Sequence, residues 1–140
     1  TNGSSLTGDL RVAMKEADVF IGVSKGNMVD EDMIRSMHKK PIIFALANPI
    51  PEIMPDKAKN AGAFIVATGR SDFPNQLNNV LAFPGIFRGA LDHGVRHITT
   101  KMLEKAAHAL ATCVKKPTVD MILPRAFDKR VVKAVANAIR

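Results

Sequence analysis

Short apolar runs alternate with stretches of amphipathic-helix spacing through the first half of the chain. The apolar runs are residues 19–23, 42–47 and 63–68, and residues 9–17 before them are typical of the end of an amphipathic helix. Short runs rich in Val, Ile and Phe predict buried strands. Because each connection is about as long as one helix, the pattern predicts parallel β-α-β units whose helices cover a sheet.

Cap residues and helix breakers set the expected bounds of the helices between these strands. Asp30 is a good N-cap for a helix that continues to about Lys39, and Pro41 stops that helix. Pro55 suits the first turn of the next helix, and Gly62 suits the position just past its end. The first half is therefore predicted to run strand, helix, strand, helix, strand.

Beyond the third predicted strand, the pattern becomes helical. Residues 79–91 predict a helix that the Pro84-Gly85 pair kinks or splits. Thr99 is expected to cap a further helix, and a last helix is expected over residues 128–139. The positions expected on the buried faces of these last two helices are Met102, Leu103, Ala106, Leu110 and Ala111, followed by Val131, Val132, Val135 and Ile139.

The predicted strands are apolar on both faces, which is typical of strands with a neighbour on either side. Three parallel strands alone make a thin sheet. We therefore expect the C-terminal part of a larger α/β, doubly wound parallel sheet. Residues 1–75 would form a partial sheet and residues 76–140 would be mostly helical. An upstream segment or a partner subunit would supply the missing strands.

Composition narrows the class of protein. The 140 residues fit one domain, and 46% hydrophobic with 24% charged residues excludes a disordered chain. No run approaches the roughly 18 apolar residues that a membrane span needs, and the first residues lack the features of a signal peptide. The single cysteine, Cys113, indicates a reducing, cytoplasmic compartment. The net charge of +7 is spread over short basic pairs, which favours solvated surface over nucleic-acid binding.

The loops that follow the strands are candidates for chemistry. In open α/β sheets, ligands bind beyond the carboxyl ends of the strands. This rule selects residues 24–26, 48–52 and 69–72, which are polar and rich in Gly or Pro. The opposite ends of the strands have the composition of plain helix-to-strand turns. The asymmetry favours a ligand crevice at the first edge.

Several residues near this edge have both a structural and a functional interpretation. Gly22 fits the close approach of a ligand or backbone, or a small residue under a packed helix. The Asn48 carboxamide could hydrogen-bond a substrate carboxylate or a nicotinamide amide, or cap its own turn. Asn78 and Asn79 precede an apolar helix, where they could cap it or help it hold an anion.

The remaining polar residues and the cysteine give weaker indications of a functional site. Arg70 could bind a carboxylate or a phosphate, or pair locally with Asp72. The four histidines show no metal-ligand spacing with carboxylates, so no metal site is expected in this chain. Cys113 is expected to be an inert core thiol. No two glycines are spaced i, i+2, which excludes the G-x-G-x-x-G dinucleotide loop.

Three segments closely resemble bacterial-type malic enzymes. They are residues 17–24 (ADVFIGVS), 43–53 (IFALANPIPEI) and 67–91 (ATGRSDFPNQLNNVLAFPGIFRGAL). The resemblance covers nearly the whole chain and corresponds to the later half of that family's Rossmann-like NAD(P)-binding domain plus its C-terminal helices. These oxidoreductases convert (S)-malate to pyruvate and CO₂ with NAD or NADP, assisted by Mg²⁺ or Mn²⁺.

The resemblance implies roles for individual residues. Asn48 would contact malate and lie beside the nicotinamide. Asn79 would hold a malate carboxylate, with Asn78 next to it in the substrate site. The residues implied to line the cofactor site are Gly22, Val23, Ser24 and Asn48.

Other functional groups of the family have no counterpart here. The chain has no tyrosine for the general acid, and Glu52 and Asp72 do not match the family's metal ligands. The resemblance therefore implies a fragment that is inactive alone, whose missing N-terminal segments hold the metal and whose full enzyme is a homo-oligomer, such as a dimer. NAD and NADP stay open, because the residue that reads the ribose 2′ position follows the absent glycine loop. A non-catalytic nucleotide-binding or assembly module is the alternative function.

Overall fold

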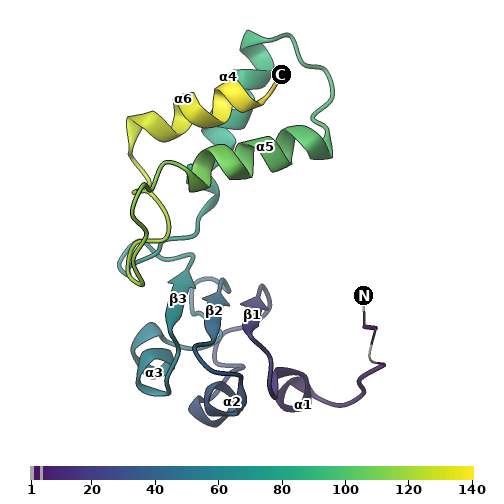
Figure 1. Cartoon of the computed structure of the whole chain (residues 1–140), viewed down its shortest axis with the longest axis vertical. Helices are drawn as coiled ribbons and strands as arrows, with labels where there is room; N and C mark the ends of the chain where they lie inside the picture. The colour runs from purple at the N-terminus through teal and green to yellow at the C-terminus, as the bar shows by residue number, and fades with distance from the viewer. Residues whose placement is uncertain (1, 4) are drawn as a thin grey trace. The chain divides into compact units, whose positions relative to one another are not determined.

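A computed structural model describes residues 2–3 and 5–140 (Figure 1). Between Phe73 and Pro74 the chain divides into two compact units. The first contains a parallel sheet with helices, and the second is helical. Among the described residues, no helix is long and apolar enough to cross a membrane.

The first unit is built on three parallel strands that lie side by side in chain order (Figure 1). The strands are β1 (Val19–Gly22), β2 (Ile42–Ala45) and β3 (Ile65–Thr68). In the register of the sheet, Gly22 pairs with Ala45, and Ala45 pairs with Thr68. The three carboxyl ends are therefore level. The Rossmann-like β-α-β architecture predicted from the sequence is confirmed.

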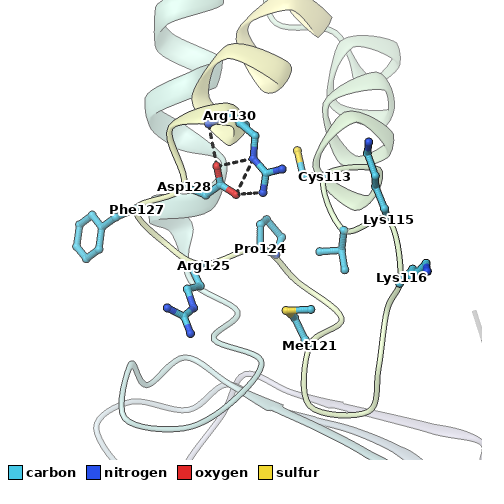
Figure 2. Close-up of a pocket in the computed structure, with 10 residues that line it drawn as sticks. Cys113, Lys115, Lys116, Met121, Pro124, Arg125, Phe127, Asp128 and Arg130 are labelled. Carbon is cyan, nitrogen blue, oxygen red and sulfur yellow. Dashed lines mark hydrogen bonds and ion pairs between the residues drawn. The ribbon is translucent and has the colours of Figure 1, made fainter.

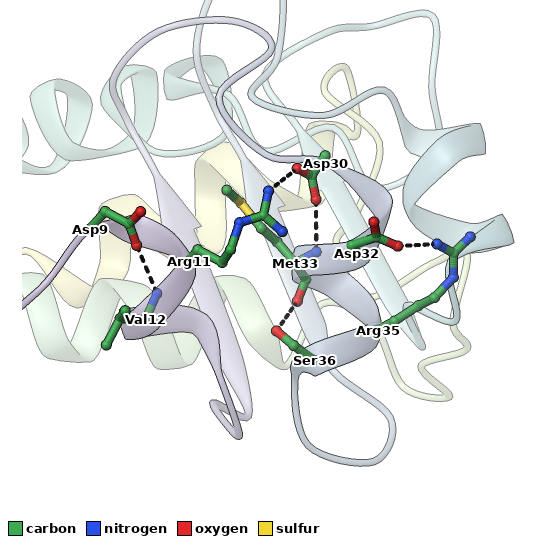
Figure 3. Close-up of polar contacts among 8 residues, drawn as sticks. All are labelled: Asp9, Arg11, Val12, Asp30, Asp32, Met33, Arg35 and Ser36. Carbon is green, nitrogen blue, oxygen red and sulfur yellow. Dashed lines mark hydrogen bonds and ion pairs between the residues drawn. The ribbon is translucent and has the colours of Figure 1, made fainter.

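Helices α1 (Leu10–Met14), α2 (Glu31–Ser36) and α3 (Pro55–Asn60) accompany these strands. Figure 3 shows the polar contacts of the first two. The Asp9 carboxylate caps α1 by accepting from Val12 N–H, and the Asp30 carboxylate caps α2 by accepting from Met33 N–H. Arg11 also pairs with Asp30 at 2.5 Å, which links the two helices. The Met33 N–H, and then Arg11, hold the pKa of Asp30 below its usual value.

Helix α2 is shorter than its sequence pattern predicts. It ends at Ser36, so the expected continuation to about Lys39 is wrong. The Ser36 carbonyl accepts from Glu16 N–H, and His38 N–H donates to the Ala17 carbonyl. These long-range bonds draw the backbone away from helical geometry and towards the turn before β1.

The core of the first unit lies between its helices and one face of the sheet. Ile43 and Ala45 on β2 are fully buried in this core, together with Ile34 from α2 and Ala58 from α3. Right-handed crossovers between strands added in one direction place the helices on the same face. The other members of the buried cluster are Met14, Val29, Met37, Ile53, Ala61 and Val66.

Only β2 has a neighbouring strand on both sides within the described residues. The edge strand β1 leaves Val19 and Ile21 46% and 63% exposed. The sequence pattern predicts an interior position for every strand, but among the described residues only β2 has such a position. Completion of the sheet by strands outside these residues stays a prediction.

The second unit consists of η1 (Asn79–Leu81), α4 (Phe83–Asp92), α5 (Thr100–Ala111) and α6 (Lys129–Ala138). The expected interruption near Pro84 is a split, because Pro84 lies in the first turn of α4, where its missing N–H costs nothing. Thr99 caps α5 as predicted, by accepting from Met102 N–H.

Helix α6 packs against both α4 and α5. Val131, Val135 and Ile139 are buried as predicted. The buried face expected for α5 is only partly confirmed. Ala106 is buried, whereas Leu103 is 45% exposed and Ala111 is also exposed. Val132 of α6 is likewise 37% exposed. The side chains that pack with these core residues are Ile86, Ala82, Ala90, Val95, Met102, Leu110, Cys113 and Ala138.

Candidate functional site

Ser24 and Asn48 follow the carboxyl ends of two neighbouring strands. Ser24 comes after β1 and Asn48 after β2, and both residues are exposed. The sheet ladder continues past the strand ends, because Leu46 N–H donates to the Gly22 carbonyl at 3.0 Å. The structure thus brings these two predicted site residues to the same edge of the sheet.

A buried carboxylate joins the two loops. Glu52 is 0% exposed. Its Oε1 accepts from the Ser24 N–H at 2.9 Å, and its Oε2 accepts from the Ala47 N–H at 3.0 Å. The Ser24 hydroxyl lies 3.5 Å from the same Oε1. One side chain therefore holds the backbone at Ser24 and the backbone immediately before Asn48.

Backbone hydrogen bonds extend this connection. The N–H of Asn27 donates to the Pro51 carbonyl at 3.0 Å, and the N–H of Val29 donates to the Glu52 carbonyl at 3.0 Å. Within the loop after β2, the Asn48–Pro49 peptide bond is cis. The segments after β1 and β2 are therefore joined along several residues.

The Glu52 carboxylate occupies the space that a side chain at residue 22 would need. A Cβ built on Gly22 would lie 2.5 Å from both Cδ and Oε1 of Glu52, and 2.8 Å from the Phe20 ring. The sequence allowed two interpretations of Gly22: close approach by a ligand or a neighbouring backbone, or a small residue packed under a helix. The structure shows instead that a polar side chain fills the space, and the predicted contact of Gly22 with a cofactor stays a prediction.

The third loop carries a local ion pair. Arg70 Nε and Nη2 donate to Asp72 Oδ1 and Oδ2 at 2.9 and 2.6 Å, which confirms local pairing. The hydrogen bond from Arg70 lowers the pKa of Asp72, and the same bond raises the pKa of Arg70. Arg70 Nη1 also donates to the Pro49 carbonyl at 3.4 Å. The loop after β3 is thereby connected to the loop after β2.

In the second unit, the two candidate asparagines differ in role. Asn78 is the N-cap of η1, and its side chain accepts from the Val80 N–H at 3.1 Å. The capping interpretation is therefore confirmed for Asn78. Asn79 is the first residue of η1 and is exposed. Asn48 belongs to the first unit and Asn79 to the second, so the convergence of their side chains on one ligand stays a prediction.

Asn75 has a structural role in the second unit. Its backbone has φ 56°, and its side chain is 6% exposed. Asn75 Nδ2 donates to the Val119 carbonyl at 2.7 Å, and its Oδ1 accepts from the Ile122 N–H at 2.8 Å. Asparagine tolerates the left-handed conformation better than most residues. Its carboxamide also has the donor and the acceptor needed to bind the backbone at Val119 and Ile122.

The second unit also contains a pocket of about 910 Å³, which the sequence did not indicate (Figure 2). Asp128 and Arg130 are paired on its wall at 2.6 Å. Phe127 points away from the other labelled side chains and is 92% exposed. Cys113 is half-buried at this pocket and packs against the core of the second unit, and its expected inertness stays a prediction. The other lining residues are Val114, Lys115, Lys116, Met121, Pro124 and Arg125.

Two histidines contact residues that are distant in the sequence. His38 Nδ1 lies 3.3 Å from Asp18 Oδ1, and His93 Nδ1 lies 2.8 Å from the Ile139 carbonyl. Within residues 2–3 and 5–140, no three His, Cys, Asp or Glu side chains are grouped so that they could hold a metal ion. The residues present therefore do not fit a divalent cation.

A parallel sheet with covering helices, and with a hydroxyl and a carboxamide in the loops at its carboxyl edge, is the arrangement of an open α/β domain that binds ligands at that edge. Residues 7–139 match the sequence model described as the NAD-binding domain of malic enzyme. The chain belongs to the malic enzyme family.

Curated relatives and solved structures agree with this membership. The chain is 54% identical over 141 residues to the bifunctional malic/malolactic enzyme of Bacillus subtilis (strain 168), covering 99% of this chain and 34% of that protein. It is 42% identical to the NADP-dependent malic enzyme of Haemophilus influenzae, covering 91% of this chain and 19% of that protein. The crystal structure of the NAD-dependent malic enzyme of Thermotoga maritima superposes with a TM-score of 0.95 at 52% identity, covering 99% of this chain and 36% of that one. The chain thus spans about a third of the Bacillus relative.

The exposed groups at the sheet edge combine polar and apolar surface. Ser24 offers a hydroxyl, Asn48 offers an amide donor and acceptor, and Val23 beside them is 78% exposed. Ribose hydroxyls and a carboxamide-bearing ring need such a mixture of hydrogen-bonding and apolar surface. No glycine-rich loop for the pyrophosphate occurs in the sequence.

Proposed function

We propose that the chain forms the nicotinamide side and part of the malate site of an enzyme that converts (S)-malate to pyruvate and CO₂ with NAD or NADP. The placement of Ser24 and Asn48 at one sheet edge, held by Glu52, carries this proposal. The family match and the names of the relatives support it. The remaining catalytic groups would come from segments outside these 140 residues.

Each residue has a defined task in this proposal. Asn48 binds malate and orients the nicotinamide carboxamide, since its neutral amide can both donate and accept at any working pH. Asn79 donates to a malate carboxylate, with Asn78 beside it. Gly22, Val23 and Ser24 line the ribose and nicotinamide.

NAD or NADP, when bound, would supply the hydride acceptor for malate oxidation. Mg²⁺ or Mn²⁺ would take its ligands from segments outside this chain, since the described residues contain no cluster of three potential metal ligands. A cytoplasmic location and a homo-oligomeric enzyme, such as a dimer, complete the proposal.

The test uses a full-length chimaera, defined as the Bacillus subtilis relative with this chain in place of the 141 residues that align with it. We expect malate-dependent reduction of NAD or NADP by the chimaera and none by the isolated 140-residue chain. The isolated chain has no tyrosine to serve as the acid. A folded chimaera without malate-dependent turnover would contradict the proposal, as would turnover by the isolated chain.

A substitution in the chimaera separates the site from the scaffold. Asn48→Ala should lower kcat/KM for malate by about 10- to 100-fold, because one polar contact to substrate or cofactor is worth about 1–3 kcal/mol. Asn60→Ala is the control, since Asn60 is an exposed asparagine at the end of α3 in the same unit. Equal kinetics in the two variants would exclude Asn48 from the site.

A further inference from the structure

Glu52 is a buried acidic side chain that accepts hydrogen bonds from backbone amides of both site loops. The remaining aspartates and glutamates of the described chain are exposed or only half-buried. We propose that Glu52 is the positioning residue that fixes Ser24 and Asn48 relative to each other, an inference that rests on the proposed function. Its carboxylate acts through the two backbone amides, one in each loop.

The carboxylate holds each loop next to a site residue. Oε1 binds the N–H of Ser24 itself, at 2.9 Å. Oε2 binds the N–H of Ala47, at 3.0 Å, and Ala47 immediately precedes Asn48. The two oxygens of one rigid carboxylate are a fixed distance apart. A movement of either loop therefore lengthens one of these two bonds.

The chemistry of the two donors requires a carboxylate at this position. An ionised carboxylate has two acceptor oxygens and no donor, whereas a glutamine amide has one acceptor and an NH₂ group. With glutamine, one backbone N–H would face the NH₂ group in either orientation of the amide. Burial of a carboxylate is unfavourable unless the carboxylate is well hydrogen-bonded. If residue 52 served only to fill space between the two loops, an apolar side chain would do so without this cost.

Gly22 makes the arrangement possible. Its missing side chain leaves the space that the Glu52 carboxyl group occupies, since a Cβ there would be 2.5 Å from Cδ. The carboxylate therefore lies directly against the end of β1. Reaction rates are sensitive to such placement, because a displacement of about 1 Å can cost about 100-fold.

The test compares Glu52→Gln and Glu52→Asp in the chimaera with Glu104→Gln, an exposed glutamate on α5. Kinetics are measured well below the melting temperature of each variant, with malate carrying hydrogen or deuterium at C2. We expect Glu52→Gln to lower kcat/KM by about 10- to 100-fold and to raise the deuterium isotope effect, because a misplaced nicotinamide slows hydride transfer. Glu52→Asp keeps both acceptors and should retain more activity than Glu52→Gln.

A residue with only a structural role would lower the melting temperature and leave kcat, KM and the isotope effect of the folded enzyme unchanged. That result in either Glu52 variant that folds would overturn the proposal. The aspartate variant keeps the test decisive if the glutamine variant does not fold.

Hydrogen exchange gives a readout that does not depend on activity. The amides of Ser24 and Ala47 should exchange about tenfold faster in Glu52→Gln than in the unsubstituted chimaera. Glu104→Gln should leave their exchange unchanged. Unchanged protection in Glu52→Gln would contradict the positioning role even in an inactive chimaera, whereas inactivity of the unsubstituted chimaera contradicts only the proposed function.

Discussion

The carboxyl carbon of Glu52 lies 2.5 Å from the point where a Cβ of residue 22 would stand. Gly22 ends β1, and Glu52 lies in the loop after β2, so the contact joins two neighbouring strand ends. The glycine and the glutamate are therefore interdependent. A side chain at residue 22 and the present position of the carboxylate exclude each other.

The first prediction concerns this pair. Gly22→Ala should destabilise the chain by about 1–3 kcal/mol through overpacking, and should lower the activity of the chimaera by displacing the carboxylate from the Ser24 and Ala47 amides. Urea denaturation and malate kinetics measure the two effects. Glu52→Asp should partly relieve Gly22→Ala, because the shorter side chain leaves room for the added methyl. Strictly additive effects in the double variant would show that the two residues do not interact.

A second prediction addresses Asn79. Asn79→Ala should weaken malate binding by the chimaera by about 1–3 kcal/mol, since a malate carboxylate loses a hydrogen-bond donor. The measurement is the dissociation constant for malate, together with KM. Asn137→Ala, an exposed asparagine on α6, is the control in the same unit. An unchanged affinity for malate would leave Asn79 as a residue of η1 with no part in the site.

The third prediction is on the packing of α4 against α6. A Cβ on Gly89 would lie 2.3 Å from the Ala136 carbonyl oxygen and 2.9 Å from the Ala136 Cα. Backbone atoms cannot turn aside as a flexible side chain can, so the two helices would have to separate. Gly89→Ala should therefore lower the free energy of unfolding by about 1–2 kcal/mol, although alanine is the better helix former by about 1 kcal/mol.

The control for Gly89→Ala is Ala107→Gly, at an exposed position of α5. It measures the helix-propensity difference where no neighbour interferes. Stabilisation of the chain by Gly89→Ala, measured in urea, would show that α4 and α6 do not pack as closely as described.

The fourth prediction tests the cap of α5. Thr99 Oγ1 accepts from the Met102 N–H at 3.3 Å. Thr99→Ala should cost about 1 kcal/mol of stability, because the first turn loses a hydrogen-bond acceptor. Thr99→Ser keeps the hydroxyl and should cost much less. Equal melting temperatures for the alanine and serine variants would show that the Thr99 hydroxyl does not stabilise α5.

Much of the fold could be predicted from local sequence. The apolar runs at residues 19–23, 42–47 and 63–68 identified the three strands, although each observed strand is shorter at one end. Caps at Asp30 and Thr99 were also predicted correctly. These features depend on side-chain periodicity and on hydrogen bonds within a few residues, both of which the sequence displays directly.

The site was predictable only in part. The rule that ligands bind beyond the carboxyl ends of parallel strands selected the loops of Ser24 and Asn48, and the structure places both at one edge. Glu52 lies in the selected loop 48–52, but its sequence context indicates no positioning role for it. Its burial depends on donors from a segment that is distant in sequence.

The sequence by itself determined the order of strands and helices, the absence of a glycine-rich phosphate loop and a tyrosine, and the resemblance to malic enzymes. The tertiary structure alone decided that α2 stops at Ser36, that Glu52 lies buried against Gly22, and that Gly89 lets α4 approach α6. The physical reason is one of range. Periodicity and capping act between residues a turn apart, whereas burial and close packing depend on which distant segments the fold brings into contact.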